Sequence, residues 1–255
     1  MSSLPQTPSF RLDGRRALIT GASRGIGMGA ACALAQAGAD VVLAARSADE
    51  LEAVCDALKR AGYAASSIVL DISDIDTAQQ RIADAGAFDI LINNAGINRP
   101  GPMVDMTTDD FDTVMNLNVR AAYFVAQTVV RQMIAAGKGG SIINTSSQMG
   151  HVGGIDRTVY CASKFAVEGV TRALAIEVGE HNIRVNTVCP TFIATPLTEK
   201  TLSDPERVAW IRSKIKLGRI GQIEDVMGAF VFLASDAASL ITGTSLLIDG
   251  GWTAG

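Results

Sequence analysis

Short apolar runs alternate with longer mixed segments along most of this chain. The runs lie at positions 17–19, 41–44, 68–70, 90–92, 142–143, 185–188 and 246–248. They are continuous rather than alternating, which is typical of parallel strands that are buried on both faces. The segments between them, such as 26–37 and 49–60, are long enough for crossover helices. The pattern therefore predicts an α/β fold with a doubly wound, mostly parallel sheet of about seven strands.

The organisation of the chain is expected to be simple. No linker, repeat or low-complexity tract interrupts the alternation, so we expect a single domain over residues 1–255. The segment at about 196–217 departs from the rhythm, because it carries two prolines, Trp210 and a polar start. We interpret it as an insertion between the sixth strand and the next helix, at the sheet edge where such folds bind ligands. It is either a loop that covers the substrate or an ordinary surface excursion.

Composition and charge exclude several classes of protein. The chain has 22 basic and 26 acidic residues, a formal net charge of −4, and so lacks the basic excess that nucleic-acid binding needs. No apolar run approaches the roughly 18 residues that cross a bilayer, so no membrane partner is expected. The first ten residues, MSSLPQTPSF, do not read as a secretory signal.

Cysteine and histidine usage narrows the chemistry further. The four cysteines, Cys32, Cys55, Cys161 and Cys189, are widely spaced and form no CxxC pair, which favours a reducing, cytoplasmic compartment. With only two histidines, His151 and His181, no metal site is expected. Acid–base chemistry near neutral pH must then use another kind of residue.

A glycine-rich turn follows the first predicted strand. It reads Thr20-Gly21-Ala22-Ser23-Arg24-Gly25-Ile26-Gly27 and leads into a helix-like segment. Glycines there permit a tight turn, a close approach of the backbone to a pyrophosphate, and close packing of helix on sheet. The helix N-terminus adds free N–H groups for the phosphates. The turn therefore predicts a Rossmann-like dinucleotide site.

The end of the second predicted strand indicates which dinucleotide binds. A site that prefers NAD usually has an acidic residue there for the ribose 2′-hydroxyl. This chain has Ala45-Arg46 instead, and Arg24 supplies a second cation nearby. A guanidinium pairs well with a 2′-phosphate, so NADP(H) is favoured and NAD(H) is the alternative.

Tyr160 and Lys164 are the candidates for acid–base chemistry. Their spacing of four residues puts them on one face of a helix that runs to about Val178. A phenol titrates near pH 10, and a neighbouring ammonium, together with an oxidised nicotinamide, is expected to lower that value. Ser147, at the end of the fifth strand, can hold a substrate oxygen beside the phenol, with Ser146 as its rival. Asn118 is a polar residue in an apolar helix and either holds a water for Lys164 or kinks the helix.

Together these motifs resemble the short-chain dehydrogenases/reductases from about Leu12 to Gly251. The resemblance rests on the glycine turn, Asn93-Asn94-Ala95-Gly96, Asn118, Ser147, Tyr160 with Lys164, and Asp249-Gly250-Gly251. It implies that Tyr160 is the general acid/base, Ser147 positions the carbonyl, Lys164 holds the nicotinamide ribose and Asn118 anchors a relay water. It also implies cofactor contacts from Asp71 and Ile72 at the adenine, from Asn94, Ala95 and Gly96, and from Ile193 at the carboxamide. One departure is Pro190-Thr191, where the family often has Pro-Gly.

The resemblance implies an oxidoreductase that interconverts a secondary alcohol and a ketone. Polar residues near the site suggest a polar substrate such as a sugar, polyol or sugar acid: Asn98, Arg99, Gln148, His151, Asp156 and Arg157. The pair Asn98-Arg99 resembles sugar-acid members of the family. A β-ketoacyl thioester reductase is the alternative enzyme, and a catalytically idle NADP-binding regulator is the alternative of another class.

Two apolar helices predict an oligomer. The segment from Asp112 to Ala136 reads as one helix that is apolar almost all round, and the helix that begins near Tyr160 carries small residues. We expect both helices on one side of the sheet, paired with a symmetry mate. Trp252, after the last strand, offers a second apolar contact, so a homotetramer is expected, with a dimer as the alternative.

Overall fold

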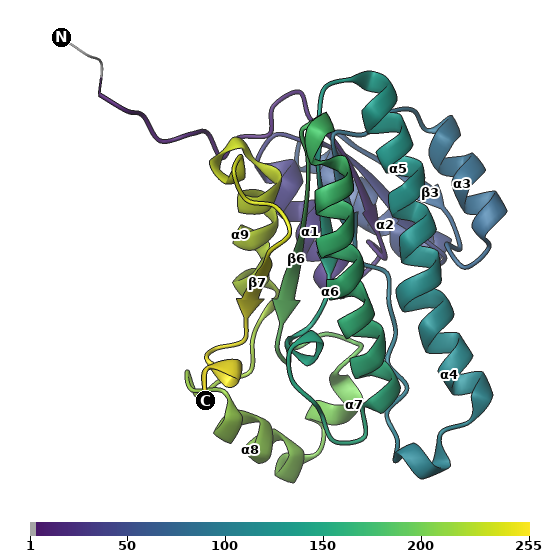
Figure 1. The fold of residues 1–255 in the computed structure, drawn as a ribbon, viewed down its shortest axis with the longest axis vertical. Helices are drawn as coiled ribbons and strands as arrows, with labels where there is room; N and C mark the ends of the chain where they lie inside the picture. The colour runs from purple at the N-terminus through teal and green to yellow at the C-terminus, as the bar shows by residue number, and fades with distance from the viewer. Residues whose placement is uncertain (1–3) are drawn as a thin grey trace.

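Seven parallel strands form the centre of the structure (Figure 1), a computed structural model that describes residues 4–255. Residues 1–3, which belong to the expected domain and to the segment that does not read as a secretory signal, lie outside the described part. The sheet has the order β3-β2-β1-β4-β5-β6-β7, and every pairing is parallel, which confirms the predicted doubly wound sheet. The strands are β1 (Arg16–Thr20), β2 (Asp40–Ala45), β3 (Ala65–Val69), β4 (Ile90–Asn93), β5 (Gly140–Thr145), β6 (Ile183–Pro190) and β7 (Ser245–Ile248).

One strand lies earlier than its apolar run predicts. The run at 68–70 extends past the end of β3, which covers Ala65–Val69. β3 is an edge strand with β2 as its neighbour, and most of its residues are half-buried or exposed. The polar residues Ser66 and Ser67 can therefore lie at the solvent-exposed edge without a desolvation cost, and this strand needs no continuous apolar run.

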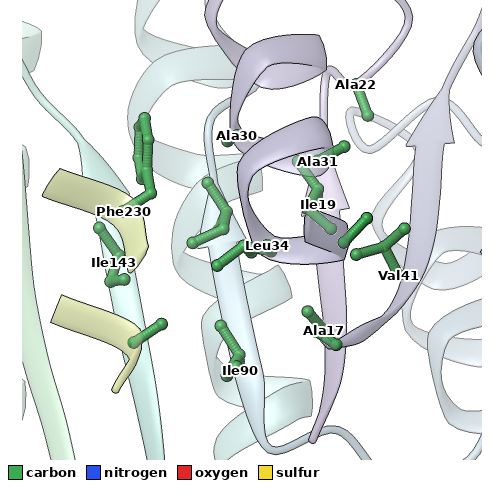
Figure 2. Close-up of a cluster of buried hydrophobic side chains, with 14 of the residues drawn as sticks. Ala17, Ile19, Ala22, Ala30, Ala31, Leu34, Val41, Ile90, Ile143 and Phe230 are labelled. Atoms are coloured by element: carbon green, nitrogen blue, oxygen red, sulfur yellow. The ribbon is translucent and has the colours of Figure 1, made fainter. Parts of the chain in front are cut away.

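Helices cover both faces of the sheet. They are α1 (Gly25–Gln36), α2 (Ala48–Arg60), α3 (Ile75–Asp84), α4 (Thr108–Met115), α5 (Ala122–Ala136), α6 (Thr158–Val178), α7 (Glu199–Leu202), α8 (Pro205–Lys214) and α9 (Ile223–Ala234). Side chains from α1, α2 and α9 form the core on one face, and those from α3, α5 and α6 form it on the other. Figure 2 shows the first core, where Leu34 of α1 and Phe230 of α9 pack against Ile90 and Ile143 of the sheet.

The apolar segment from Asp112 to Ala136 is not one regular helix, contrary to the prediction. A π-helical turn, Asn116–Ala121, separates α4 from α5. Two buried amides stabilise this irregularity: Asn93 Nδ2 donates to the carbonyl of Ala122 at 2.7 Å, and Asn118 bonds across to the backbone of Ile97. Such turns interrupt the helical ladder and often mark functional sites. Hydrophobic periodicity alone does not reveal them.

The segment between β6 and α9 contains the two helices α7 and α8. This is the position predicted for the insertion at 196–217. Asp204 caps α8, because its side chain accepts from the N–H groups of Glu206 and Arg207, and Pro205 opens the helix. In Figure 1, α7 and α8 lie at the end of the molecule where the carboxyl ends of the strands point.

Two expectations from composition concern membranes and disulfides. Among residues 4–255, no helix combines the length and apolarity needed to span a membrane. The four cysteines are free thiols.

Candidate active site

The glycine turn between β1 and α1 forms a narrow cradle. Gly21 and Gly25 have φ values of 65° and 57°, in the left-handed region that favours glycine. A Cβ on Gly27 would lie 2.2 Å from the carbonyl oxygen of Gly21. Arg24, the residue before α1, makes no side-chain cap, so the first N–H groups of the helix are open to a ligand. The turn fits a dinucleotide pyrophosphate as the sequence predicts.

Charged side chains gather where the adenosine end of a dinucleotide would bind. Arg46 follows β2 and lies 3.8 Å from the carboxylate of Asp71. Burial would raise the pKa of Asp71, but hydrogen bonds from Ser73 and the charge of Arg46 hold it below its usual value. Arg24 lies 3.6 Å from Glu50 of α2, and Ser23 donates a 3.2 Å hydrogen bond to the same carboxylate. The sequence predicted both arginines but missed Glu50, whose contact with the turn requires the packed α2.

The end of β4 is bonded directly to the glycine turn. The hydroxyl of Thr20 accepts from the N–H groups of Asn94 and Ala95, and the Asn94 amide donates to the carbonyls of Thr20 and Gly21. These bonds place residues 94–96 beside the turn, which agrees with their expected place along the cofactor. Ile72, the other expected adenine contact, is buried at 4% exposure.

The backbone after β6 keeps polar groups free for a ligand. The carbonyl of Ile193 accepts from the Thr198 hydroxyl, while its N–H has no partner within residues 4–255. The Thr191 hydroxyl is likewise buried and unpaired in the described chain. Unpaired buried polar groups are uncommon, so this segment fits the expected contact with a nicotinamide carboxamide.

Tyr160 and Ser147 meet at the carboxyl end of β5. The Ser147 side chain is close enough to the phenol to lower its pKa, and it accepts from the N–H of Met149 at 3.1 Å. Ser147 therefore occupies the position beside Tyr160, and Ser146 does not. Burial raises the pKa of Tyr160 to about 12, although Ser147 and the charge of Arg157 both act to lower it. Within the protein alone, burial therefore outweighs the groups that lower the pKa of Tyr160, and the lowering expected from Lys164 together with an oxidised nicotinamide stays a prediction.

Lys164 is buried one helical turn after Tyr160. Its Nζ donates to the carbonyl of Thr145 at 2.8 Å and lies 5.5 Å from the centre of the Tyr160 ring. Burial lowers the pKa of Lys164 to about 8, while Cys189 and Glu168 oppose that shift. The hydrogen bond to Thr145 therefore holds the ammonium beside the phenol, but desolvation disfavours its charged form.

Glu168 is a buried acid behind Lys164 that the sequence reasoning missed. It accepts from the Ser245 hydroxyl at 2.5 Å and from the Cys189 thiol at 3.3 Å, and His151 Nε2 lies 3.6 Å away. Burial would raise the pKa of Glu168, but these hydrogen bonds hold it below its usual value. His151, expected near a polar substrate, therefore faces this cluster. The potential metal-ligand atoms of His151, Glu168 and Cys189 lie within 4.8 Å of one another. The expectation that the protein has no metal site stays a prediction.

Asn118 connects the π-helical turn to the loop after β4. Its Oδ1 accepts from the N–H of Ile97 at 2.8 Å, and its Nδ2 donates to the carbonyl of Ile97 and to Ser163. Both amide hydrogens are therefore used inside the protein. Of the two expectations for this residue, the structure shows the irregular helix, and the water held for Lys164 stays a prediction.

The segment that precedes α6 lines a cavity. This cavity of about 590 Å³ separates residues 152–155 from Trp210 and Lys214 of α8 and from the C-terminal residues 252–255. Tyr160 and Ser147 do not line it. Gln148 is buried at 1% exposure, and the Asn98 Oδ1 is buried and unpaired in the described chain. The insertion thus borders a cavity together with the segment before α6 and the C-terminal residues.

Comparisons with known proteins identify relatives that cover nearly the whole chain. A family model described as enoyl-(acyl carrier protein) reductase matches residues 21–253. Gluconate 5-dehydrogenase of Gluconobacter oxydans (strain 621H) is 41% identical over 248 residues, 96% of either chain. D-erythrulose reductase of Gallus gallus is 39% identical over 245 residues, 96% of this chain and 98% of that one. The solved gluconate 5-dehydrogenase from Burkholderia cenocepacia J2315, in complex with NADP and tartrate, has a TM-score of 0.94 and 36% identity, covering 96% of this chain and 98% of the other.

These matches extend over nearly the whole chain, from the glycine turn to the last strand. They include the parallel sheet and the segments that carry Ser147, Tyr160 and Lys164. The chain belongs to the short-chain dehydrogenase/reductase family.

Proposed function

We propose that this protein is an NADP(H)-preferring oxidoreductase that interconverts a secondary alcohol and a ketone on a small, sugar-like molecule. The observation that carries the proposal is the meeting of Tyr160, Ser147 and Lys164 at the carboxyl end of β5. This constellation lies in a fold whose glycine turn fits a dinucleotide, and doubly wound sheets bind ligands at that edge.

The chemistry divides between the cofactor and the chain. A bound nicotinamide cofactor supplies or accepts the hydride. Ser147 and Tyr160 hold the substrate oxygen through their hydroxyls, and Tyr160 donates a proton to a ketone or accepts one from an alcohol. Because burial raises the pKa of Tyr160 to about 12, the phenol is protonated at neutral pH and ready to donate. The charge of Lys164, 5.5 Å from the ring centre, stabilises the phenolate that remains.

The preference for NADP(H) is supported by the residues at the adenosine end. Ala45 leaves the end of β2 without a carboxylate, and Arg46 and Arg24 bring two exposed guanidinium groups to that region. Guanidinium groups pair bidentately with phosphate, whereas an acid at the same place would repel it. The solved relative from Burkholderia cenocepacia contains NADP.

The substrate class is supported by the relatives, whose names describe a gluconate 5-dehydrogenase and a D-erythrulose reductase. The test is a panel assay in which the purified chain is offered NADPH and NADH with ketoses, keto acids of sugars and acetoacetyl thioesters. The proposal expects turnover of sugar-like ketones with NADPH at a kcat/KM well above that with NADH. Turnover of thioesters alone would favour the β-ketoacyl alternative, and no turnover would favour an idle cofactor-binding protein.

A homotetramer is part of this proposal. Large apolar side chains stay exposed on α5 and α6, where Tyr123, Phe165 and Ile176 are 47%, 49% and 84% exposed. The two helices lie on the same side of the sheet, as Figure 1 shows. Burying them against a symmetry mate would remove this surface from water, and Trp252 offers a second contact. Free thiols support a reducing, cytoplasmic location.

A further inference from the structure

Arg157 is a buried cation without an anionic partner. It precedes α6, three residues before Tyr160, and is 5% exposed. Its Nη1 donates to the carbonyl of Asp156 at 3.0 Å, the one hydrogen bond of this guanidinium within residues 4–255, where no carboxylate comes within 4.0 Å of it. A guanidinium has five N–H donors and stays charged. Because a buried charge without a partner is costly, this group requires an anion.

The nearest acid is already engaged elsewhere. The carboxylate of Asp156 lies 3.8 Å from Arg207 of α8, which also pairs with Asp204 at 3.6 Å. Asp156 has a φ of 58°, unusual for a residue other than glycine, and its carbonyl also accepts from the N–H of Gly101 at 3.1 Å. Strained backbone of this kind persists where the surroundings hold it and clusters at ligand sites. Asp156 and Asp204 thus neutralise Arg207, and Arg157 is left without a carboxylate partner.

Arg157 lies beside Gly154 of the segment that lines the cavity near α8, although Arg157 does not itself line that cavity. Its stem packs on Gly154, where an added Cβ would lie 3.3 Å from the Cβ of Arg157, and Gly154 lines the cavity. Burial has the largest influence on the pKa of Arg157 and of Tyr160, and each group also responds to the charge of the other. Arg157 lies at the start of α6, one helical turn before Tyr160, so a ligand anion at Arg157 would belong to the molecule that reacts at Tyr160.

A second arginine near the predicted site is already neutralised. Arg99, after β4, donates to the carboxylate of Asp110 at 3.0 Å and is half-exposed. A substrate anion would have to displace Asp110 to pair with Arg99. At Arg157 it would displace no side chain.

We propose that Arg157 binds the carboxylate of the substrate, so that the substrate class is an aldonate and its keto acid rather than a neutral polyol and its ketose. The inference rests on the proposed function and deepens it, because the relatives named above include proteins for both classes. Arginine pairs with a carboxylate through two parallel N–H donors, which fixes orientation as well as affinity. The carboxylate would hold the chain of the substrate while a hydroxyl-bearing carbon reaches Tyr160.

The test compares matched substrates that differ in one group. The kcat/KM of NADP-dependent oxidation is measured for six-carbon aldonates, gluconate included, and for the alditols of the same configuration, such as sorbitol. The wild-type chain is expected to prefer the aldonates by at least about tenfold, and Arg157→Gln is expected to lower the aldonate-to-alditol ratio by about a hundredfold, the scale of a charge-assisted hydrogen bond. Arg157→Lys should lie between them, because it keeps the charge and loses the paired donors.

Arg99→Gln is the matched control, since it removes the same charge from an arginine that is already paired. It should change the ratio by less than about threefold, and NADPH binding measured by fluorescence checks that each variant is folded. A ratio in Arg157→Gln that matches the wild type, or a larger effect in Arg99→Gln, would overturn the role of Arg157 while the proposed function stands. Alditols as the better substrates would do the same. Turnover of neither set would refute the proposed function and this inference with it.

Discussion

Glu50 is expected to oppose NADP(H) binding, and its charge can be removed without changing its shape. Its carboxylate accepts from Ser23 at 3.2 Å and lies 3.6 Å from Arg24 in the glycine turn. A 2′-phosphate that pairs with Arg24 must compete with this carboxylate. Glu50→Gln therefore frees Arg24 and removes a negative charge from the phosphate site.

The size of the effect follows from the exposure of the pair. Two unit charges 3.6 Å apart interact by about 1.2 kcal/mol in water. Arg24 and Glu50 are 64% and 47% exposed, and such surface pairs contribute at most about 1 kcal/mol. Since 1.4 kcal/mol corresponds to a factor of ten, kcat/KM for NADPH should rise by up to about fivefold. The value for NADH, which has no 2′-phosphate, should stay within about twofold.

The assay measures kcat/KM for both cofactors at low and high salt, because screening weakens exposed charge pairs. The gain with NADPH should shrink at high salt. Glu52→Gln is the control: Glu52 is an exposed acid on the same helix and makes no ion pair within the described residues. Equal gains in both variants, or equal gains for both cofactors, would refute the contact with Arg24 as the cause.

The remaining predictions concern stability and pH. Gly27→Ala forces a Cβ to within 2.2 Å of a backbone oxygen, so it should destabilise the fold by about 1–3 kcal/mol and weaken NADPH binding. Gly228→Ala is the control, because its Cβ meets no described atom within 4 Å and should have neither effect. Thermal unfolding compares the stability of the two variants. Asp225 belongs to the capping box of α9 and pairs with Arg219, which with the N-cap bond lowers its pKa to about 2. Asp225→Asn should cost about 1 kcal/mol near neutral pH, a loss that disappears as the pH falls from about 4 towards 2 in denaturation series. Because burial raises the pKa of Tyr160 to about 12, initial rates of alcohol oxidation, which need the phenolate, should keep increasing as the pH rises above neutrality and reach no plateau near pH 8.

The sequence predicts the sheet well because buried parallel strands are continuous apolar runs. It also predicts the positions of the glycine turn and of Tyr160 and Lys164, since local spacing determines which side chains share a turn. β3 is shifted because an edge strand needs no apolar continuity. The π-helical turn near Asn118 is not predicted from the sequence, because the hydrogen bonds that stabilise it involve Asn93 and Ile97, which are distant in sequence.

Charge balance is the part of the site that the sequence alone does not reveal. The sequence gives no reason to distinguish Arg99 from Arg157. In the folded chain Arg99 pairs with Asp110, whereas Arg157 is buried without an acidic partner among the described residues. Glu168 and Glu50 likewise reach the site only through helix packing. The burial that raises the pKa of Tyr160 is also not visible in the sequence, because it depends on the assembled fold.

The central claim is that Tyr160 transfers the proton, and Tyr160→Phe tests it most directly. The substitution removes the hydroxyl and keeps the ring, and Tyr123→Phe on α5 makes the same change at an exposed position. NADPH affinity, measured by fluorescence, should stay within about threefold of the wild type in both variants. The measurement is the single-turnover rate of ketone reduction with bound NADPH. The account predicts a loss of at least about a hundredfold in Tyr160→Phe and none in Tyr123→Phe, and a Tyr160→Phe rate near that of the wild type would contradict it.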